Sequence, residues 1–224
     1  MVRRTKEEAL ETRNRILDAA ELLFLEKGVS RTSLEMIAAA AGLTRGAIYW
    51  HFRNKADLFD AMMSRVVLPM EEMAARASGE DLDDPLAYVR GCAINVLDHL
   101  ATDPRCQRVF EICCHKVEYV DEMLQVRQRH IEARNNCLQH MERGLRNAAR
   151  KGLLAPTVNP QLAATGLHAL VDGLIMNWVL DPKHMALGRD ATALVDQYLD
   201  ALRPASSGAA ARKPSRRPAE SESA

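Results

Sequence analysis

The stretch TSLEMIAAAAGLTRGAIYWHF, residues 32–52, decides the fold of the N-terminal part of this chain. Apolar residues recur in its first half at three- and four-residue spacing: Leu34, Ile37, Ala38 and Ala41. This spacing predicts a short amphipathic helix that ends at Gly42. Thr44 stands where the cap of a second helix, about seven residues long, is expected. Two short helices joined by a turn of about three residues with a glycine form a helix-turn-helix.

The residues before this motif complete a three-helix unit. Thr32 and Glu35 have the spacing of a capping box, in which Thr32 accepts from an unpaired amide and Glu35 reaches back. Residues 8–27 carry apolar residues at helical spacing, and Gly28 follows where a helix commonly ends. The sequence therefore predicts a helix-turn-helix domain over residues 1–54.

The aromatic residues of the second short helix divide between two faces. The chain has only ten aromatic residues in 224, and three of them lie at positions 49–52. At 100° per residue, Ile48 and Phe52 share one face, which should pack on the first two helices. Tyr49 and Trp50 project from the other side. An ordinary helical corner with a chance cluster of aromatics is the alternative, but exposed aromatics usually mark a contact surface.

The chemistry of the outward face suits DNA. Arg45 can fork onto a guanine or grip a phosphate, and Gly46 lets the backbone approach a groove closely. Tyr49 can donate its hydroxyl to a phosphate. The predicted DNA contacts are Thr44, Arg45, Gly46, Tyr49, Trp50, His51 and Lys55, together with Thr32, Ser33, Arg3 and Arg4.

Helix signals continue to residue 202, and no segment predicts a strand. Asn54 can cap a long helix from near Lys55, and three prolines (Pro85, Pro104 and Pro160) follow capping residues as they do at helix starts. Residues 160–180 are apolar almost all round, and residues 190–202 have a wide apolar face. We therefore expect an all-α fold of about nine helices, with a larger domain over residues 55–203.

Composition and charge limit the function of this larger domain. The chain has no net charge, and residues 61–202 carry 15 Lys and Arg against 19 Asp and Glu, which argues against DNA binding there. We find no signal peptide and no run of the ~20 apolar residues that a membrane span needs. The five cysteines are odd in number and lack CxxC spacing, so we expect reduced thiols in a cytoplasmic protein without metal or cofactor.

Catalytic motifs are missing from the sequence. It contains no GxSxG, GxxxxGK[ST], HExxH or GxGxxG pattern, so we predict that the protein is not an enzyme. The one cluster with metal or redox chemistry is Cys113-Cys114-His115. Adjacent helical residues point about 100° apart, so these three do not converge unaided. Two small core residues and a surface histidine are the alternative interpretation.

The run from Ile16 through AAELLFLEKGVSRTSLEMIAAAAGLTRGAIYWHFRNKADLF resembles the DNA-binding region of TetR-family transcriptional regulators. The opening MVRRTKEEA and the segment VFEICCHKVEYVDEM resemble the narrower AcrR/TtgR-like group, which represses multidrug efflux operons. The resemblance implies a homodimeric repressor of a palindromic operator, released by a small hydrophobic compound. Two alternatives within the family stay open: sensing of redox state or metal through the Cys113 cluster, and control of a metabolic operon.

The resemblance also implies a ligand cavity among the helices of the larger domain. The expected lining residues are Val96, Phe110, Cys114, Cys137, Val171, Asp172 and Ile175. Asp172 is a carboxylate in an otherwise apolar helix, where burial requires a partner. It could anchor a polar ligand group or bond to a neighbouring helix.

The last two helices should form the dimer interface as a four-helix bundle. The residues expected there are Leu174, Trp178, Leu194, Tyr198 and Leu202. Residues 204–224 are rich in Pro, Ser and Ala with local basic charge, and we expect a disordered tail. A solubilising role and a nonspecific DNA-tethering role both fit that tail.

Overall fold

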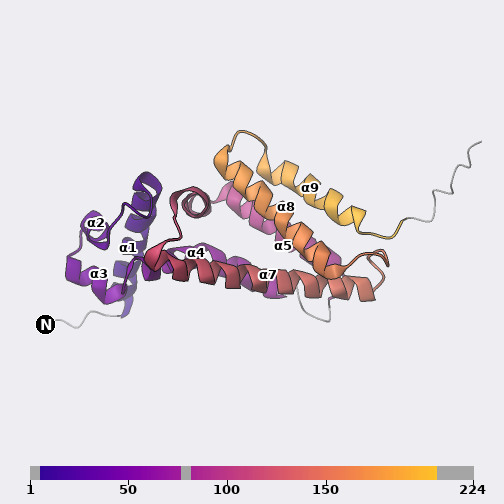
Figure 1. Ribbon diagram of the computed structural model, residues 1–224, viewed down its shortest axis with the longest axis horizontal. Coiled ribbons are helices and arrows are strands. Elements are labelled where there is room, and N and C mark those ends of the chain that lie inside the picture. Colours follow the sequence, from indigo (N-terminus) through magenta and orange to yellow (C-terminus); the bar gives the residue numbers. More distant parts are fainter. Residues whose placement is uncertain (1–5, 77–81, 206–224) are drawn as a thin grey trace, which may run out of the picture.

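The computed structural model describes residues 6–76 and 82–205. Within these residues the chain forms nine α-helices and no strand, as the sequence predicts (Figure 1). The helices are α1 (Lys6–Lys27), α2 (Leu34–Ala40), α3 (Arg45–His51), α4 (Lys55–Arg76), α5 (Pro85–Thr102), α6 (Pro104–Glu111), α7 (Leu124–Arg150), α8 (Pro160–Leu180) and α9 (Leu187–Ala201). A π-helical turn, η1 (Ile112–Lys116), and a 3₁₀ turn, η2 (Asp121–Met123), lie between α6 and α7. Arg3, Arg4 and nearly all of the predicted tail lie outside the described residues.

The helices form two groups (Figure 1). α1, α2 and α3 gather at one end of the molecule, and α4 begins there, packs against α1 and continues alongside α7. α5, α8 and α9 pack together on the far part of α7. α4 therefore belongs to both groups, so a shift of its axis would displace its contacts with the helix-turn-helix and with the larger domain.

The helix starts follow the local sequence signals. Asn54 accepts the backbone amide of Asp57 at 2.8 Å at the start of α4. Three prolines stand at the first turns of α5, α6 and α8, each behind a polar residue whose side chain accepts an amide of that turn: Asp84, Asp103 and Asn159. Proline lacks the amide that such a position would leave unpaired, which explains the preference. The predicted starts of these four helices, α4, α5, α6 and α8, are confirmed.

The cap of α2 is one residue later than the sequence predicts. The Ser33 side chain accepts the Met36 amide at 3.2 Å, so Ser33 and not Thr32 is the N-cap. Thr32 is buried, and its hydroxyl donates to the Gly28 carbonyl at 2.8 Å. Thr32 therefore closes the loop after α1. The predicted capping box between Thr32 and Glu35 is therefore wrong. Of the two adjacent hydroxyl residues, only Ser33 caps α2.

α3 is divided into a buried and an exposed face, as predicted. Thr44 caps it by accepting the Ala47 amide. Ile48 and Phe52 are 0% and 2% exposed, whereas Tyr49 and Trp50 are 43% and 72% exposed. The buried pair belongs to the same continuous core as the apolar face of α1. The direction of α3 is therefore fixed by its own apolar side chains.

A buried carboxylate on α1 joins this helix to α6. Glu21 of α1 lies 2.5 Å from Nε of Arg108 and 3.5 Å from Nε of Arg105, both on α6. One turn earlier, Asp18 pairs with Arg105 at 3.0 Å and with Arg65 of α4 at 2.7 Å. The Glu21 side chain is only 3% exposed. Loss of Arg105 and Arg108 with the packing intact would leave this charge buried without a partner, which is costly.

α8 is apolar on most of its surface. By length and composition alone it could cross a membrane, although the sequence analysis expects no such run. Core helices of soluble proteins pass the same test, and one face of α8 is buried here through Ala163, Leu167, Val171 and Ile175. Three further apolar side chains of α8 remain exposed in the single chain: Leu162, Met176 and Leu180. The covering of α8 is thus incomplete within one chain.

Phe52→Ala should lower the free energy of unfolding by roughly 3–5 kcal/mol, because it removes a buried ring and leaves a cavity. Trp50→Ala is the control, since its larger ring is mostly exposed, and should change stability by less than about 1 kcal/mol. Urea denaturation followed by circular dichroism would measure both. Equal losses in the two variants would contradict the division of α3 into two faces.

Candidate nucleic-acid interface and effector region

The exposed face of α3 carries side chains suited to DNA. Arg45, Tyr49 and Trp50 are exposed, and the Arg45 guanidinium lies 5.6 Å from the centre of the Tyr49 ring. A Cβ atom added at Gly46 would meet no protein atom within 4 Å. Packing within the chain therefore does not require glycine there, whereas close approach of an outside surface does favour it.

An acidic residue of α2 completes this face. The Tyr49 hydroxyl donates to Glu35 Oε1 at 3.0 Å, and Arg45 Nε lies 3.3 Å from the same oxygen. The pKa of Glu35 is lowered, first by its own backbone amide and then by the hydroxyls of Tyr49 and Ser33. Sequence reasoning gives Glu35 only a capping role. Its actual partners lie on the next helix, and their approach depends on an interhelical angle that no sequence pattern reveals.

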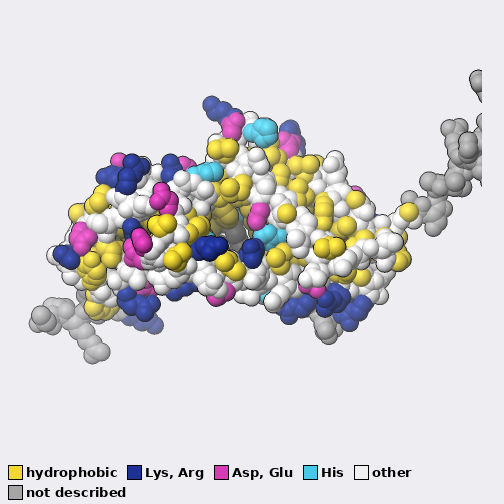
Figure 2. Space-filling model, viewed as in Figure 1, with side chains coloured by type: hydrophobic (Ala, Val, Ile, Leu, Met, Phe, Trp, Pro, Cys, Tyr) yellow, Lys and Arg dark blue, Asp and Glu magenta, His cyan; other side chains and the backbone are white. Residues whose placement is uncertain are grey.

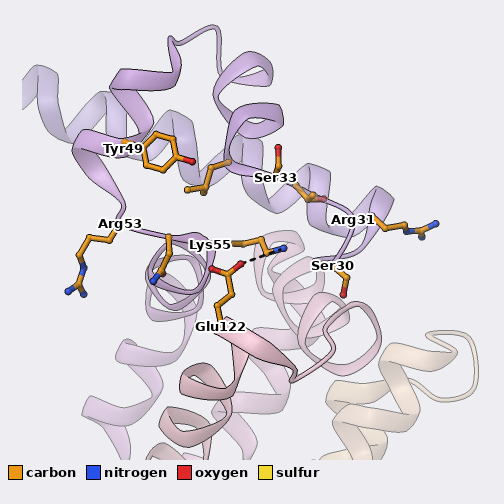
Figure 3. Close-up of a pocket in the computed structure, with 10 residues that line it drawn as sticks. Ser30, Arg31, Ser33, Tyr49, Arg53, Lys55 and Glu122 are labelled. Atoms are coloured by element: carbon orange, nitrogen blue, oxygen red, sulfur yellow. Dashed lines mark ion pairs between the residues drawn. The ribbon is translucent and has the colours of Figure 1, made fainter.

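A pocket of about 350 Å³ separates the helix-turn-helix from the segment before α7 (Figure 3). Hydroxyl, basic and amide side chains dominate its lining, which comprises Ser30, Arg31, Thr32, Ser33, Leu34, Tyr49, Arg53, Asn54, Lys55 and Glu122. Such a lining is polar and carries more basic than acidic groups. It suits an anion such as a backbone phosphate better than an apolar compound.

Lys55 lies in this pocket between the two parts of the molecule. Its Nζ atom donates to the Val29 carbonyl at 3.0 Å and lies 3.9 Å from Glu122 Oε1, the ion pair drawn in Figure 3. The Lys55 side chain is only 15% exposed. The sequence predicts a DNA contact at Lys55, and the structure gives its side chain two partners within the chain.

The other predicted contacts occupy three environments. Ser33 and Thr44 are exposed at the starts of α2 and α3. His51 is half-buried, and its ring stands edge-on to the Trp50 ring at 4.5 Å between centroids. Thr32 faces the interior, so its side chain is not available to DNA. This last position corrects the expected contact set.

The segment before α7 is bonded to the loop after α1. The Val29 amide donates to the Lys116 carbonyl at 2.9 Å, and the Ser30 hydroxyl lies 3.4 Å from the Glu118 carboxylate. Tyr119 of the same segment contacts α7, since its hydroxyl lies 2.8 Å from Nδ1 of His130. Residues 116–122 thus form a junction between the helix-turn-helix and the larger domain, and we call this segment the connector.

The expected effector-lining residues come from five elements of the larger domain. Val96 lies on α5, Phe110 on α6, Cys114 on η1 and Cys137 on α7, and all four are half-buried. Val171 and Ile175 are buried on α8. Figure 2 shows the surface hollowed near the middle of the molecule, beside α7 and α8 in this view.

Asp172 lies near two of the expected lining thiols. Burial raises the pKa of Cys114, and it raises the pKa of Cys137 to about 11, with the Asp172 carboxylate as a second cause in each case. The Asp172 side chain is itself exposed, and it lies 3.1 Å from Nδ1 of His168, one turn earlier on α8. Of the two alternatives for Asp172, the bond to a neighbouring helix is not what this geometry gives, because its partner His168 lies on α8 itself. The role of a ligand anchor stays a prediction.

Comparison with known proteins identifies the fold family. Residues 16–62 match the family described as "Bacterial regulatory proteins, tetR family", and residues 84–204 match the "MAATS-type transcriptional repressor, C-terminal region". The chain is 43% identical over 203 residues to the HTH-type transcriptional regulator TtgR of Pseudomonas putida, covering 91% of this chain and 97% of that protein. The chain belongs to the TetR family.

Other TetR-family regulators resemble this chain along nearly its whole length. The HTH-type transcriptional regulator AcrR of Shigella flexneri is 38% identical over 206 residues, with 89% of this chain and 94% of that protein covered. The structure of NalD, the secondary repressor of the MexAB-OprM multidrug efflux pump in Pseudomonas aeruginosa, has a TM-score of 0.81 at 38% identity, covering 88% of this chain and 99% of NalD. A SmeT–triclosan complex has a TM-score of 0.80 at 37% identity, covering 87% and 93%.

The expected dimer residues of this TetR-family chain differ in exposure. Leu174 is buried and Trp178 is half-buried, whereas Leu194 is exposed. The Tyr198 hydroxyl donates to the Ala163 carbonyl at 2.9 Å, so this ring packs α9 on α8 of the same chain. The backbone of Leu202 also has an internal role, since its carbonyl accepts the Ala155 amide. The large apolar side chains left exposed on these two helices are Leu162, Met176, Leu180 and Leu194.

The Cys113-Cys114-His115 cluster does not converge on one point. Cys113 Sγ lies 2.7 Å from the sulfur of Met63, Cys114 feels the charge of Asp172, and His115 is exposed. Among the described residues, no group of three or more His, Cys, Asp and Glu side chains is placed to hold a metal ion. None of the five cysteines is in a disulfide bond. The geometry gives no support to redox or metal sensing at this turn.

Three thiols with raised pKa values should react slowly in the native protein. Burial raises the pKa of Cys92 to about 11 and that of Cys106 to about 12, and it raises the pKa of Cys113 well above its usual value. A raised pKa keeps a thiol protonated until the pH approaches that value, and only the thiolate is nucleophilic. At pH 8, alkylation by iodoacetamide should be on the order of 10²-fold slower than in urea. Mass spectrometry would count modified cysteines, and rapid native labelling of Cys113 would contradict the prediction.

Proposed function

We propose that this chain is a homodimeric, ligand-responsive transcriptional repressor of a multidrug efflux operon. One observation carries the proposal: α3 buries Ile48 and Phe52 while it presents Arg45, Tyr49 and Trp50 to the outside. A short, firmly anchored helix with basic and aromatic side chains outward has the form of a recognition helix for the major groove. The relatives named as efflux repressors support the choice of target.

The proposed DNA surface comprises the start of α2, the outer face of α3 and the start of α4. Its members are Ser33, Thr44, Arg45, Gly46, Tyr49, Trp50, His51 and Lys55, with Arg3 and Arg4 beyond the described residues. Arg45 would read a base edge, and the hydroxyls and helix-start amides would position phosphates. Lys55 would contact a phosphate only after giving up its hydrogen bond to the Val29 carbonyl or its ion pair with Glu122. Its availability to DNA would therefore depend on the position of the connector.

The exposed apolar side chains of α8 and α9 support a homodimer. Leu162, Met176, Leu180 and Leu194 are large apolar side chains that the single chain leaves exposed on these two helices, and a second copy could cover them. A second copy would complete a four-helix bundle of two α8 and two α9 helices. Two-fold symmetry would then place two α3 helices about 34–36 Å apart, one turn of a palindromic operator.

The proposed effector is a small hydrophobic compound bound among α5, α6, α7 and α8. Val96, Phe110, Val171 and Ile175 offer apolar contacts, and Asp172 at the edge offers a charge. A compound that displaces α6 would act on α1 directly through Arg105 and Arg108. The resulting change in α3 spacing would release the operator. We assign the protein no catalytic role and place it in the cytoplasm with its DNA.

Tyr49→Ala should lower affinity for operator DNA at least tenfold while leaving the fold intact, because the ring is exposed. The probe is a palindromic duplex selected from a random library by the wild-type protein. Leu22→Ala is the control, since it truncates another exposed apolar side chain of the same domain and should leave affinity unchanged. Fluorescence anisotropy gives the affinities, and sedimentation confirms an unaltered oligomeric state. Unfolding of Tyr49→Ala, or wild-type affinity, would contradict the proposed DNA surface.

Ligand and operator should weaken each other's binding by the same factor, because coupling between two sites is reciprocal. Triclosan, the compound in the SmeT complex, is the first probe. Calorimetry on the free protein and on its operator complex would measure the two affinities. Equal affinities would rule out the coupling.

Asp172→Asn tests the anchor: unchanged triclosan affinity would restrict Asp172 to its pair with His168.

A further inference from the structure

We propose that Glu35 is a positioning residue for base recognition, which improves discrimination between DNA sequences while it lowers affinity for DNA of every sequence. It would do so by holding Arg45 and Tyr49 in one geometry. The inference rests on the proposed function, in which α3 enters the major groove. It adds a residue of α2 that makes the recognition surface selective.

Three exposed side chains form a closed cluster across the two helices of the motif. Glu35 Oε1 accepts from the Tyr49 hydroxyl at 3.0 Å and lies 3.3 Å from Arg45 Nε, and the Arg45 guanidinium lies over the Tyr49 ring. The Arg45 side chain is 73% exposed and that of Glu35 is 44% exposed. An arginine this exposed would ordinarily sample many rotamers. Here two contacts restrict its direction before DNA arrives.

The atoms used in this cluster leave the base-reading atoms free. Arg45 faces Glu35 through Nε, so both terminal amino groups remain available for the O6 and N7 atoms of a guanine. Glu35 is ionised at neutral pH, since its pKa is lowered and not raised. A charged carboxylate holds a guanidinium more firmly than a neutral amide would.

The same carboxylate opposes binding to the DNA backbone. Phosphate contacts supply most of the sequence-independent affinity, and a negative charge beside them weakens every complex alike. Orientation of Arg45, in contrast, helps only where a guanine meets it. The two effects act on different quantities: the charge sets affinity for any DNA, and the orientation sets the ratio between specific and nonspecific affinity.

Three variants separate these effects. Glu35→Ala removes both contacts, and Glu35→Gln keeps an acceptor for Tyr49 but loses the charge. Glu111→Gln is the matched control, since its side chain is 41% exposed and paired with Lys116 in the other domain. Affinity is measured by anisotropy at one salt concentration for the selected palindrome and for a scrambled duplex of equal length. Circular dichroism checks the fold, and Glu35→Gln carries the test if Glu35→Ala unfolds.

Glu35→Ala should bind the scrambled duplex several-fold more tightly, and its specific-to-nonspecific ratio should fall at least tenfold. Glu35→Gln should show a smaller fall, and Glu111→Gln should show none. With single-base variants of the palindrome, the lost discrimination should fall at the base pairs that Arg45→Ala also relaxes. In the Arg45→Ala background, Glu35→Ala should have no further effect on the ratio.

Two results would overturn the proposal. A ratio within twofold of wild type would leave Glu35 with a structural role, and relaxation at other base pairs would make it a direct contact, such as an acceptor from cytosine. A different failure belongs to the proposed function: if Arg45→Ala changes neither affinity, then α3 is not the DNA surface.

Discussion

A helix of seven residues is not stable alone in water, and the proposed DNA-binding surface lies on such a helix, α3. Tertiary contacts must therefore hold α3. Ile48 and Phe52 fill the core against α1, Thr44 closes the first turn, and Arg15 of α1 donates to the Ala41 carbonyl at 2.6 Å beside the turn. The exposed side chains inherit their positions from these contacts. Recognition is thus a property of the core as much as of the surface.

The larger domain contacts the helix-turn-helix through ion pairs and hydrogen bonds as well as through apolar packing. Glu21 and Asp18 of α1 form ion pairs with arginines of α6 and α4. The Lys55 side chain donates a hydrogen bond to the Val29 carbonyl and pairs with Glu122. Charged pairs are directional and sensitive to small displacements. A shift of α6 would therefore change the ion pairs of Glu21 and Asp18 directly. This arrangement suits a protein whose two parts must communicate.

Local signals in the sequence predict the elements well, because each depends on neighbours in the chain. Capping residues, prolines and helical spacing indicate the nine helices and the two faces of α3. Contacts between helices are less visible. The competition between Thr32 and Ser33 for one cap, the approach of Glu35 to Arg45, and the exposure of Asp172 all depend on interhelical geometry. The family resemblance provides the function, since helical spacing alone fits many contact surfaces.

The bond between the Val29 amide and the Lys116 carbonyl uses main-chain atoms only. Among ordinary substitutions, only a proline at position 29 would remove it. Gly28 beside it adopts φ +81°, a conformation that other residues rarely take. Gly28 apart, the joint does not depend on side-chain identity, while the helices around the proposed effector site contact each other through replaceable side chains. Under the proposed function, mutation of those helices would change the inducing compound and leave the proposed DNA-binding surface unaltered.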